Sequence, residues 1–162
     1  TLRPPAMRGE LLRFSNGAAL INDCYNSSPA ALQAMTALLA TTPNYRRRIL
    51  AAGEMRELGP ESAKLHREAG KFAAETGAID WILAVSGDAS EIAEGAVSAG
   101  LPLERTKFFR TSEEAARFLE GFLEPGDLLL VKGSRGVKME VIVDALIARQ
   151  APGEFARQEA KH

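Results

Sequence analysis

The strongest chemical signal in the sequence is a pair of cations at the end of an apolar strand pattern. Lys132 and Arg135 flank Gly133 and Ser134, and an amphipathic helix is predicted from Val137 to residue 149. The free N–H groups and the dipole at a helix start favour an anion, and a guanidinium matches a carboxylate or phosphate with two hydrogen bonds. The pattern indicates a binding position for a small acid, although two solvated cations fit the local sequence equally well.

The common phosphate-binding loops do not occur in the sequence. Neither Gly-x-x-x-x-Gly-Lys-Ser/Thr nor Gly-x-Gly-x-x-Gly is found. Both motifs bring backbone N–H groups against phosphates. The chain by itself is therefore not expected to hydrolyse a nucleotide.

A second candidate is the polar stretch "NDCYNSSP", which follows an expected strand. Asp23, Tyr25 and Asn26 offer a carboxylate for a sugar hydroxyl, an aromatic face and an amide within one turn, and Ser28 follows closely. This combination suits the edge of a nucleoside. The alternative is that the polar residues before Pro29 form only a turn and a helix cap.

A third candidate, "GEMRELG", places three charged residues between two glycines at the end of another expected strand. Glu54, Arg56 and Glu57 could align a ligand amine against a carboxylate. A solvated loop with an internal ion pair worth at most about 1 kcal/mol is the simpler interpretation. His66 is expected to be a packing or surface residue, and Cys24 a small buried side chain without nucleophilic character.

The elements that must position these loops alternate along the chain. A hairpin over 11–14 and 18–22, turned by Asn-Gly, precedes alternating helix and strand patterns. Alternation of this kind predicts an α/β, three-layer Rossmann-like sandwich: a mostly parallel sheet of about six strands, with one antiparallel edge strand from the N-terminal hairpin. Ligands bind beyond the carboxyl ends of such strands, so the three loops are expected at one rim.

Composition limits the classes of function. The 162 residues are 46% hydrophobic and 25% charged, with a net charge of -1, which gives no general attraction to nucleic acid or membranes. One cysteine and two histidines cannot supply a usual zinc site, and no apolar run is long enough to cross a bilayer. We expect a cytoplasmic monomer with no metal site, a domain over 1–150 and a loose polar tail over 151–162. The start at Thr1 suggests part of a longer protein.

The three loops, in this order, resemble the C-terminal domain of the Mur ligases, specifically the member that adds D-alanyl-D-alanine to UDP-N-acetylmuramoyl-tripeptide. The resemblance covers nearly all of residues 8–149. It rests on Asp23, Tyr25, Asn26 and Pro29, on "GEMRELG" followed by Ser62, His66 and Gly70, and on "VKGSR" followed by Glu140. The sequence departs from the family pattern at Asn22, Cys24, Ser27, Ser28 and Glu54, where the family usually has Asp, Ser, Ala, Asn and Asp.

This resemblance implies an ATP-dependent, ADP-forming amide ligase of peptidoglycan precursor synthesis, and hence a role in cell wall formation, cell shape and division. ATP would phosphorylate the tripeptide carboxylate, and the amine of D-alanyl-D-alanine would attack the acyl phosphate. In the family the P-loop and Mg ligands belong to a central domain and the UDP-sugar site to an N-terminal domain. The chain would then be the substrate-closing domain, inactive alone.

The resemblance also implies a division of the site between two ligands. The nucleotide-binding residues would be Asp23, Tyr25, Asn26 and Ser28, and the dipeptide-binding residues Lys132, Ser134 and Arg135, with Glu54 and Arg56 nearby. Two alternatives from other classes stay open. A phospho-receiver domain also places acids after an early strand and a lysine after a late one, but Lys132 is not followed by proline. A non-catalytic interaction module is the other.

Overall fold

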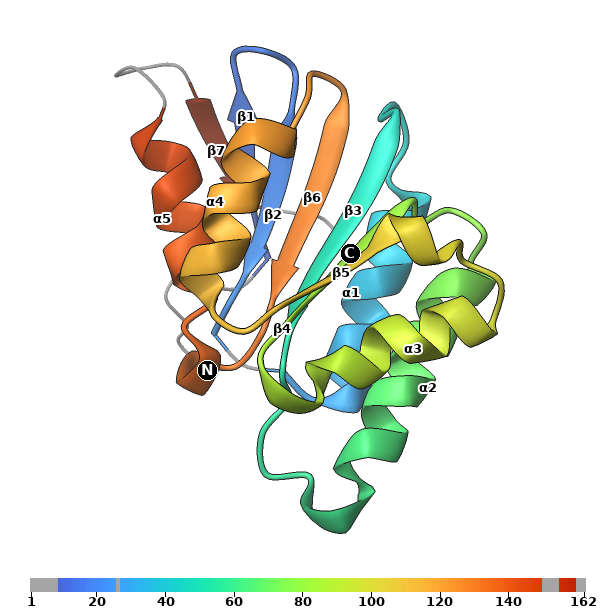
Figure 1. The fold of residues 1–162 in the computed structure, drawn as a ribbon. Helices are drawn as coiled ribbons and strands as arrows, with labels where there is room; N and C mark the ends of the chain where they lie inside the picture. The colour runs from blue at the N-terminus through green and yellow to red at the C-terminus, as the bar shows by residue number, and fades with distance from the viewer. Residues whose placement is uncertain (1–8, 26, 150–154, 160–162) are drawn as a thin grey trace.

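A computed structural model describes residues 9–25, 27–149 and 155–159, with the backbone alone for the last segment. The chain forms one seven-stranded sheet in the order β5-β4-β3-β6-β2-β1-β7, with five α-helices among the described residues (Figure 1). The strands are β1 Glu10–Phe14, β2 Ala19–Asp23, β3 Arg47–Gly53, β4 Trp81–Val85, β5 Thr106–Phe109, β6 Asp127–Lys132 and β7 Phe155–Glu159. The helices are α1 Pro29–Thr41, α2 Ser62–Glu75, α3 Ser90–Ser98, α4 Ser112–Phe122 and α5 Glu140–Ala148.

The topology of the sheet confirms the predicted fold class. The five strands that lie side by side in the order β2-β6-β3-β4-β5 are all parallel. β1 pairs antiparallel with β2 through the N-terminal hairpin. One difference concerns the range 151–162, for which a loose polar tail was predicted. Residues Phe155–Glu159 form β7, which pairs antiparallel with β1, while the rest of that range lies outside the described residues.

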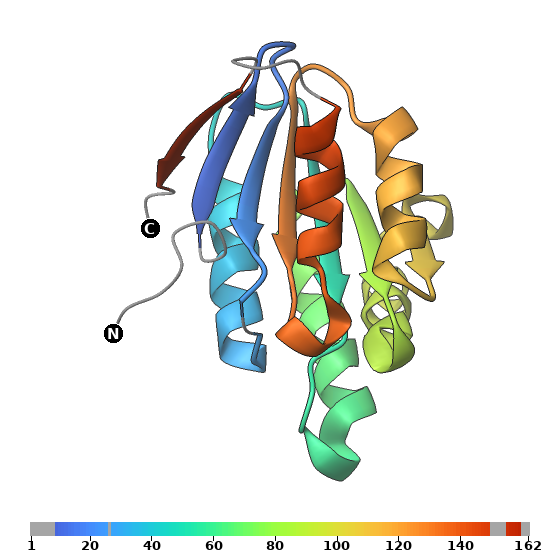
Figure 2. The same cartoon turned by 90° about the vertical axis from the view of Figure 1, so that its left-hand side faces the viewer.

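Helices cover both faces of the sheet, so the core has two halves. α4 and α5 pack on one face, and α1, α2 and α3 on the other, as Figures 1 and 2 show. The central strand β6 is buried along its whole length, and its side chains alternate between the two halves. A strand buried on both faces reads as a continuous apolar run, which is what "LLLV" from 128 to 131 is.

Local sequence signals determine where two of the helices start and where the hairpin turns. Ser28 Oγ accepts a hydrogen bond from Ala31 N (3.1 Å) at the start of α1, and Thr111 Oγ1 accepts one from Glu114 N (3.2 Å) at the start of α4. In the hairpin, Gly17 alone has a positive φ, of 96°. Asn16 has no positive φ, so the glycine alone supplies the left-handed conformation of the expected Asn-Gly turn.

The last helix begins later than its amphipathic pattern predicts. A single 3₁₀ turn occupies Arg135–Val137, Lys138 adopts the left-handed conformation at φ 61°, and α5 starts at Glu140. A left-handed residue interrupts a right-handed helix, so the turn and α5 cannot be continuous. The predicted start at Val137 was wrong by three residues. Arg135 therefore lies one turn away from the N-terminus of α5 and not on it.

Candidate functional site

The three loops singled out in the sequence lie at the same rim of the sheet. They follow β2, β3 and β6, which are neighbours in the order β3-β6-β2 and run parallel. Their carboxyl ends therefore meet at one edge, the lower one in Figure 1. We call this edge, with residues 23–25, 27–28, 53–59 and 132–136, the loop rim.

The two oppositely charged residues at the strand ends form an ion pair. Lys132 Nζ lies 3.2 Å from Asp23 Oδ2, and the two residues are direct neighbours in the β2–β6 register. The Lys132 side chain is only 3% exposed and that of Asp23 13%. Lys132 is thus inside the rim, bound to an acid of the same chain.

Among the described residues of the rim, the exposed cations are the two arginines Arg135 and Arg56. The Arg135 guanidinium carbon lies 5.3 Å from the centre of the Tyr25 ring, a cation–π contact between the β6 and β2 loops. Arg56, which is half exposed, pairs with Glu54 at 3.4 Å. Its guanidinium lies against Gly136, the residue next to Arg135. Two guanidinium groups from different loops therefore approach the same exposed turn.

The β3 loop is fastened to its neighbours on both sides. Glu54 Oε2 accepts a hydrogen bond from Asp88 N (2.8 Å) in the loop after β4, and a Cβ at Gly87 would overlap the Glu54 carboxylate. On the other side, Ser134 Oγ donates to Glu54 O at 3.4 Å. The Glu54 carboxylate is therefore engaged by the protein itself, which leaves Arg56 as the more accessible member of its pair.

The Ser28 hydroxyl caps the N-terminus of α1. The side chain is exposed, and its oxygen accepts from Ala31 N as the N-cap of α1. Asn26, the remaining predicted nucleotide-binding residue, lies outside the described residues.

Replacing Ser28 tests its role as the N-cap of α1. Ser28→Ala removes the N-cap and is expected to lower the free energy of unfolding by about 1 kcal/mol, whereas Ser28→Asp should leave it nearly unchanged. Urea unfolding of the chain measures both. Equal stability of the alanine variant and the parent chain would mean that the cap hydrogen bond contributes nothing.

Two residues with positioning roles were not identified from the sequence. Met139, fully buried, lies between the β3 and β6 loops, and a Cβ at Gly53 would come within 2.9 Å of its Cγ. A Cβ at Gly133 would overlap the same atom. His66, also fully buried, accepts from Met55 N through Nε2 (2.8 Å), so Nδ1 carries the proton and donates to Ser62 O (2.7 Å). In the sequence, the glycines at the ends of β3 and β6, Gly53 and Gly133, were the signal that a large side chain could pack against both loops.

The single thiol is chemically quiet. Cys24 is fully buried, and its sulfur donates to Val131 O at 3.7 Å. Burial raises the pKa of the Cys24 thiol well above its usual range, and the nearby carboxylates of Glu140 and Asp23 act in the same direction. The thiolate needed for nucleophilic attack is therefore strongly disfavoured, in agreement with the expectation from sequence.

The described part of the chain offers neither a metal-binding cluster nor a membrane-spanning helix. Its acidic, histidine and cysteine side chains form no group of three or more placed to hold a metal ion. None of its helices combines the length and apolar character required to cross a bilayer.

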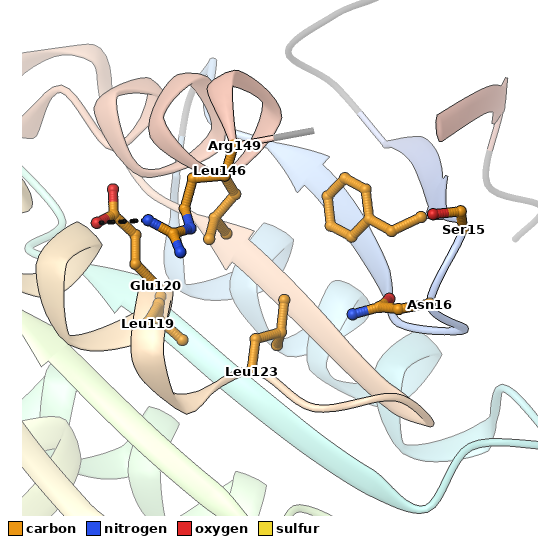
Figure 3. A pocket seen from close by; sticks show the side chains of 8 residues that line it. Ser15, Asn16, Leu119, Glu120, Leu123, Leu146 and Arg149 are labelled. Carbon is orange, nitrogen blue, oxygen red and sulfur yellow. Dashed lines mark ion pairs between the residues drawn. The ribbon is translucent and has the colours of Figure 1, made fainter. Parts of the chain in front are cut away.

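A cavity of about 310 Å³ lies at the opposite end of the sheet. The hairpin turn and the C-terminal halves of α4 and α5 form it, and Glu120 pairs with Arg149 at 3.8 Å on its wall (Figure 3). Its other lining residues are Phe14, Ser15, Asn16, Leu119, Leu123 and Leu146. None of the described residues of the loop rim contributes to this cavity.

Comparison with known proteins defines the class to which this fold and rim belong. The family model "Mur ligase, glutamate ligase domain" matches residues 7–135. The UDP-N-acetylmuramoyl-tripeptide:D-alanyl-D-alanine ligase of Bacillus subtilis is 32% identical over 146 residues, which is 90% of this chain and 32% of the relative.

Solved structures agree on the fold. A MurF from Acinetobacter baumannii superposes with a TM-score of 0.75 at 29% identity, over 88% of this chain and 30% of that one. A MurF ligase from Thermotoga maritima, crystallised in complex with ADP, has a TM-score of 0.69 at 24% identity, over 90% and 31% of the two chains. The chain belongs to the Mur ligase family, as a member of its glutamate ligase domain.

The chain spans about a third of the length of the relatives that it matches. These matches give no support to a phospho-receiver domain or to a non-catalytic interaction module. The roles predicted for individual rim residues stay predictions.

Proposed function

We propose that this chain is the C-terminal, substrate-closing domain of an ATP-dependent ligase that adds D-alanyl-D-alanine to UDP-N-acetylmuramoyl-tripeptide in peptidoglycan precursor synthesis. The observation that carries the proposal is the meeting of three loops at one rim with Arg135 and Arg56 exposed on it. The name of the Bacillus subtilis relative agrees with this activity. The domain would occupy residues 1–150, with β7 added to its sheet.

The dipeptide would bind through its carboxylate. Arg135 and Arg56 come from different loops and present guanidinium groups, which suit a planar carboxylate better than a lysine ammonium does. Ser134 and Lys132, named with them on sequence grounds, are nearly buried at 8% and 3% exposure. A carboxylate fixed at the rim leaves the amine of the dipeptide to point toward an acyl phosphate on a neighbouring domain, and such positioning supplies much of the rate in two-substrate reactions.

The adenosine side of ATP would lie against the β2 loop. The predicted contacts are Asp23 for a sugar hydroxyl and Tyr25 for the base or sugar face, with Asn26 and Ser28 beside them. Asp23 keeps part of its carboxylate exposed, although Lys132 holds one oxygen. The sequence has no phosphate loop, so another domain of the ligase would hold the phosphates and Mg. The chain alone would therefore be inactive.

A cytoplasmic location and small-molecule partners are consistent with such a ligase. ATP and a nucleotide-linked precursor place the reaction in the cytoplasm, and the partners are these small molecules together with the other domains of the same enzyme. A net charge of -1 offers no electrostatic attraction to nucleic acid. We propose that the enzyme acts as a monomer.

The test uses the complete ligase that contains this domain. Arg135→Ala should raise KM for D-alanyl-D-alanine by about tenfold or more, the effect of losing one charge-assisted contact, while KM for UDP-N-acetylmuramoyl-tripeptide changes less than about twofold. Steady-state phosphate release with each substrate varied in turn measures both constants.

Arg149→Ala is the matched control, because it removes one exposed arginine from the opposite end of the sheet. It should leave both constants unchanged. Equal increases of both constants in Arg135→Ala would remove Arg135 from the dipeptide site. No dipeptide-dependent phosphate release by the unmodified ligase would reject the proposed function itself.

A further inference from the structure

The position of Lys132 conflicts with a direct contact to substrate. Its side chain is 3% exposed, and its ammonium is held by Asp23 at 3.2 Å. Lys132 is the last residue of β6 and Asp23 the last residue of β2, and the two strands are adjacent. The two side chains therefore emerge on the same face of the sheet, where the two loops begin.

A buried ammonium needs this partner. Taking either charge out of water costs several kcal/mol, and only a close opposite charge with good geometry offsets that cost. Turning Lys132 outward to a ligand would leave the Asp23 carboxylate without its cation at the base of the rim. By contrast, Arg135 and Arg56 are already exposed and need no such rearrangement.

A second contact joins the same two loops farther out. Arg135 of the β6 loop lies over the ring of Tyr25 in the β2 loop. The ion pair at the base and the cation–π contact above it therefore connect the loop predicted to bind nucleotide with the loop predicted to bind the dipeptide.

We propose that Lys132 is a positioning residue: by holding Asp23 it fixes the β2 and β6 loops as one unit, and it does not itself contact the dipeptide. This inference rests on the proposed function for the identity of the two ligands. Its physical part, the coupling of the loops, concerns this chain alone.

The kinetic test compares Lys132→Met, Asp23→Asn and the double variant in the complete ligase. Lys132→Met should raise KM for ATP and KM for D-alanyl-D-alanine together, each by about tenfold, because both loops lose their common support. Adding Lys132→Met to Asp23→Asn should change neither constant by more than about twofold, since the interaction is already lost. Lys138→Met is the matched control: it removes an exposed lysine from the same turn and should alter neither constant.

Two outcomes would overturn the inference. An increase confined to KM for the dipeptide in Lys132→Met, retained in the Asp23→Asn background, would make Lys132 a ligand contact. The second readout needs no activity: amide NMR spectra of the 162-residue chain. Lys132→Met should shift the Cys24, Tyr25 and Ser27 resonances of the neighbouring loop, with Lys138→Met leaving them in place. Unshifted resonances would reject the coupling even if the parent enzyme has a different substrate.

Discussion

Gly70→Ala is expected to lower the free energy of unfolding by about 3 kcal/mol or more, although alanine is the better helix former. A Cβ at Gly70 in α2 would overlap the carbonyl oxygen of Ile92 in α3 and lie 2.7 Å from its carbonyl carbon. The contact is with backbone, which cannot rotate away as a side chain can. The two helices must therefore separate, and the loss of packing exceeds the gain in helix propensity of about 1 kcal/mol.

The reciprocal contact supports the same expectation for Gly95→Ala. A Cβ at Gly95 in α3 would overlap the carbonyl oxygen of Arg67 in α2. Gly121→Ala is the matched control, because Gly121 lies in α4 with nothing within 4 Å of the added Cβ. It should be neutral or stabilising by up to about 1 kcal/mol. Urea unfolding of the three variants gives the comparison, and similar stabilities for Gly70→Ala and Gly121→Ala would contradict the close approach.

The close approach of α2 and α3 also bears on the loop rim. α2 carries His66, whose Nε2 accepts from Met55 N in the β3 loop. Displacing α2 would therefore pull on the loop that presents Arg56. We expect the Gly70→Ala variant to lose order at the rim as well as stability.

Elements with strong local signals were predictable from the sequence. Pro29 after Ser28 defines the start of α1, and Thr111 with Glu114 defines the start of α4, because these signals act within one helical turn. The alternation of helix and strand patterns then predicted parallel pairing and the meeting of the three loops at one rim. Each of these inferences needs only short-range chemistry and the handedness of crossovers.

Contacts between residues distant in sequence were not predictable in the same way. Nothing near Lys132 indicates that Asp23, more than a hundred positions earlier, occupies the adjacent place in the register and neutralises it. The residues around Lys132 in the sequence would be the same whether its ammonium were exposed or buried, so the local pattern could not distinguish the two cases. The late start of α5 has a similar cause: Met139 fills the space above Gly53 and Gly133, and the chain adopts a left-handed residue at 138 immediately before it.

Arg47→Met is expected to lower the free energy of unfolding by about 3–5 kcal/mol, since it leaves a buried carboxylate without its cation. Asp127 is fully buried, and its two oxygens accept from Arg47 Nε and Nη2, both at 2.7 Å. Arg47 also donates to Phe122 O at 2.8 Å and lies 4.3 Å from the Phe122 ring centre. The hydrogen bond to Asp127 raises the pKa of Arg47. The contribution of this pair to the stability of the fold is therefore fully present below the ordinary arginine pKa, and it is lost only as the pH rises through the raised value.

Arg46→Met tests whether burial, and not charge alone, sets the size of this effect. Arg46 precedes Arg47, is 67% exposed and pairs with Glu124 at 3.4 Å. Its replacement should cost less than about 1 kcal/mol, as for other exposed pairs. The double variant Arg47→Met/Asp127→Leu should be more stable than Arg47→Met, because no charge is then left buried and unpaired. If the double variant were the less stable of the two, the Asp127 carboxylate would stabilise the fold even without its cation, for example through the hydrogen bond that it accepts from Glu124 N (2.7 Å), and the cost assigned to an unpaired buried charge would be wrong.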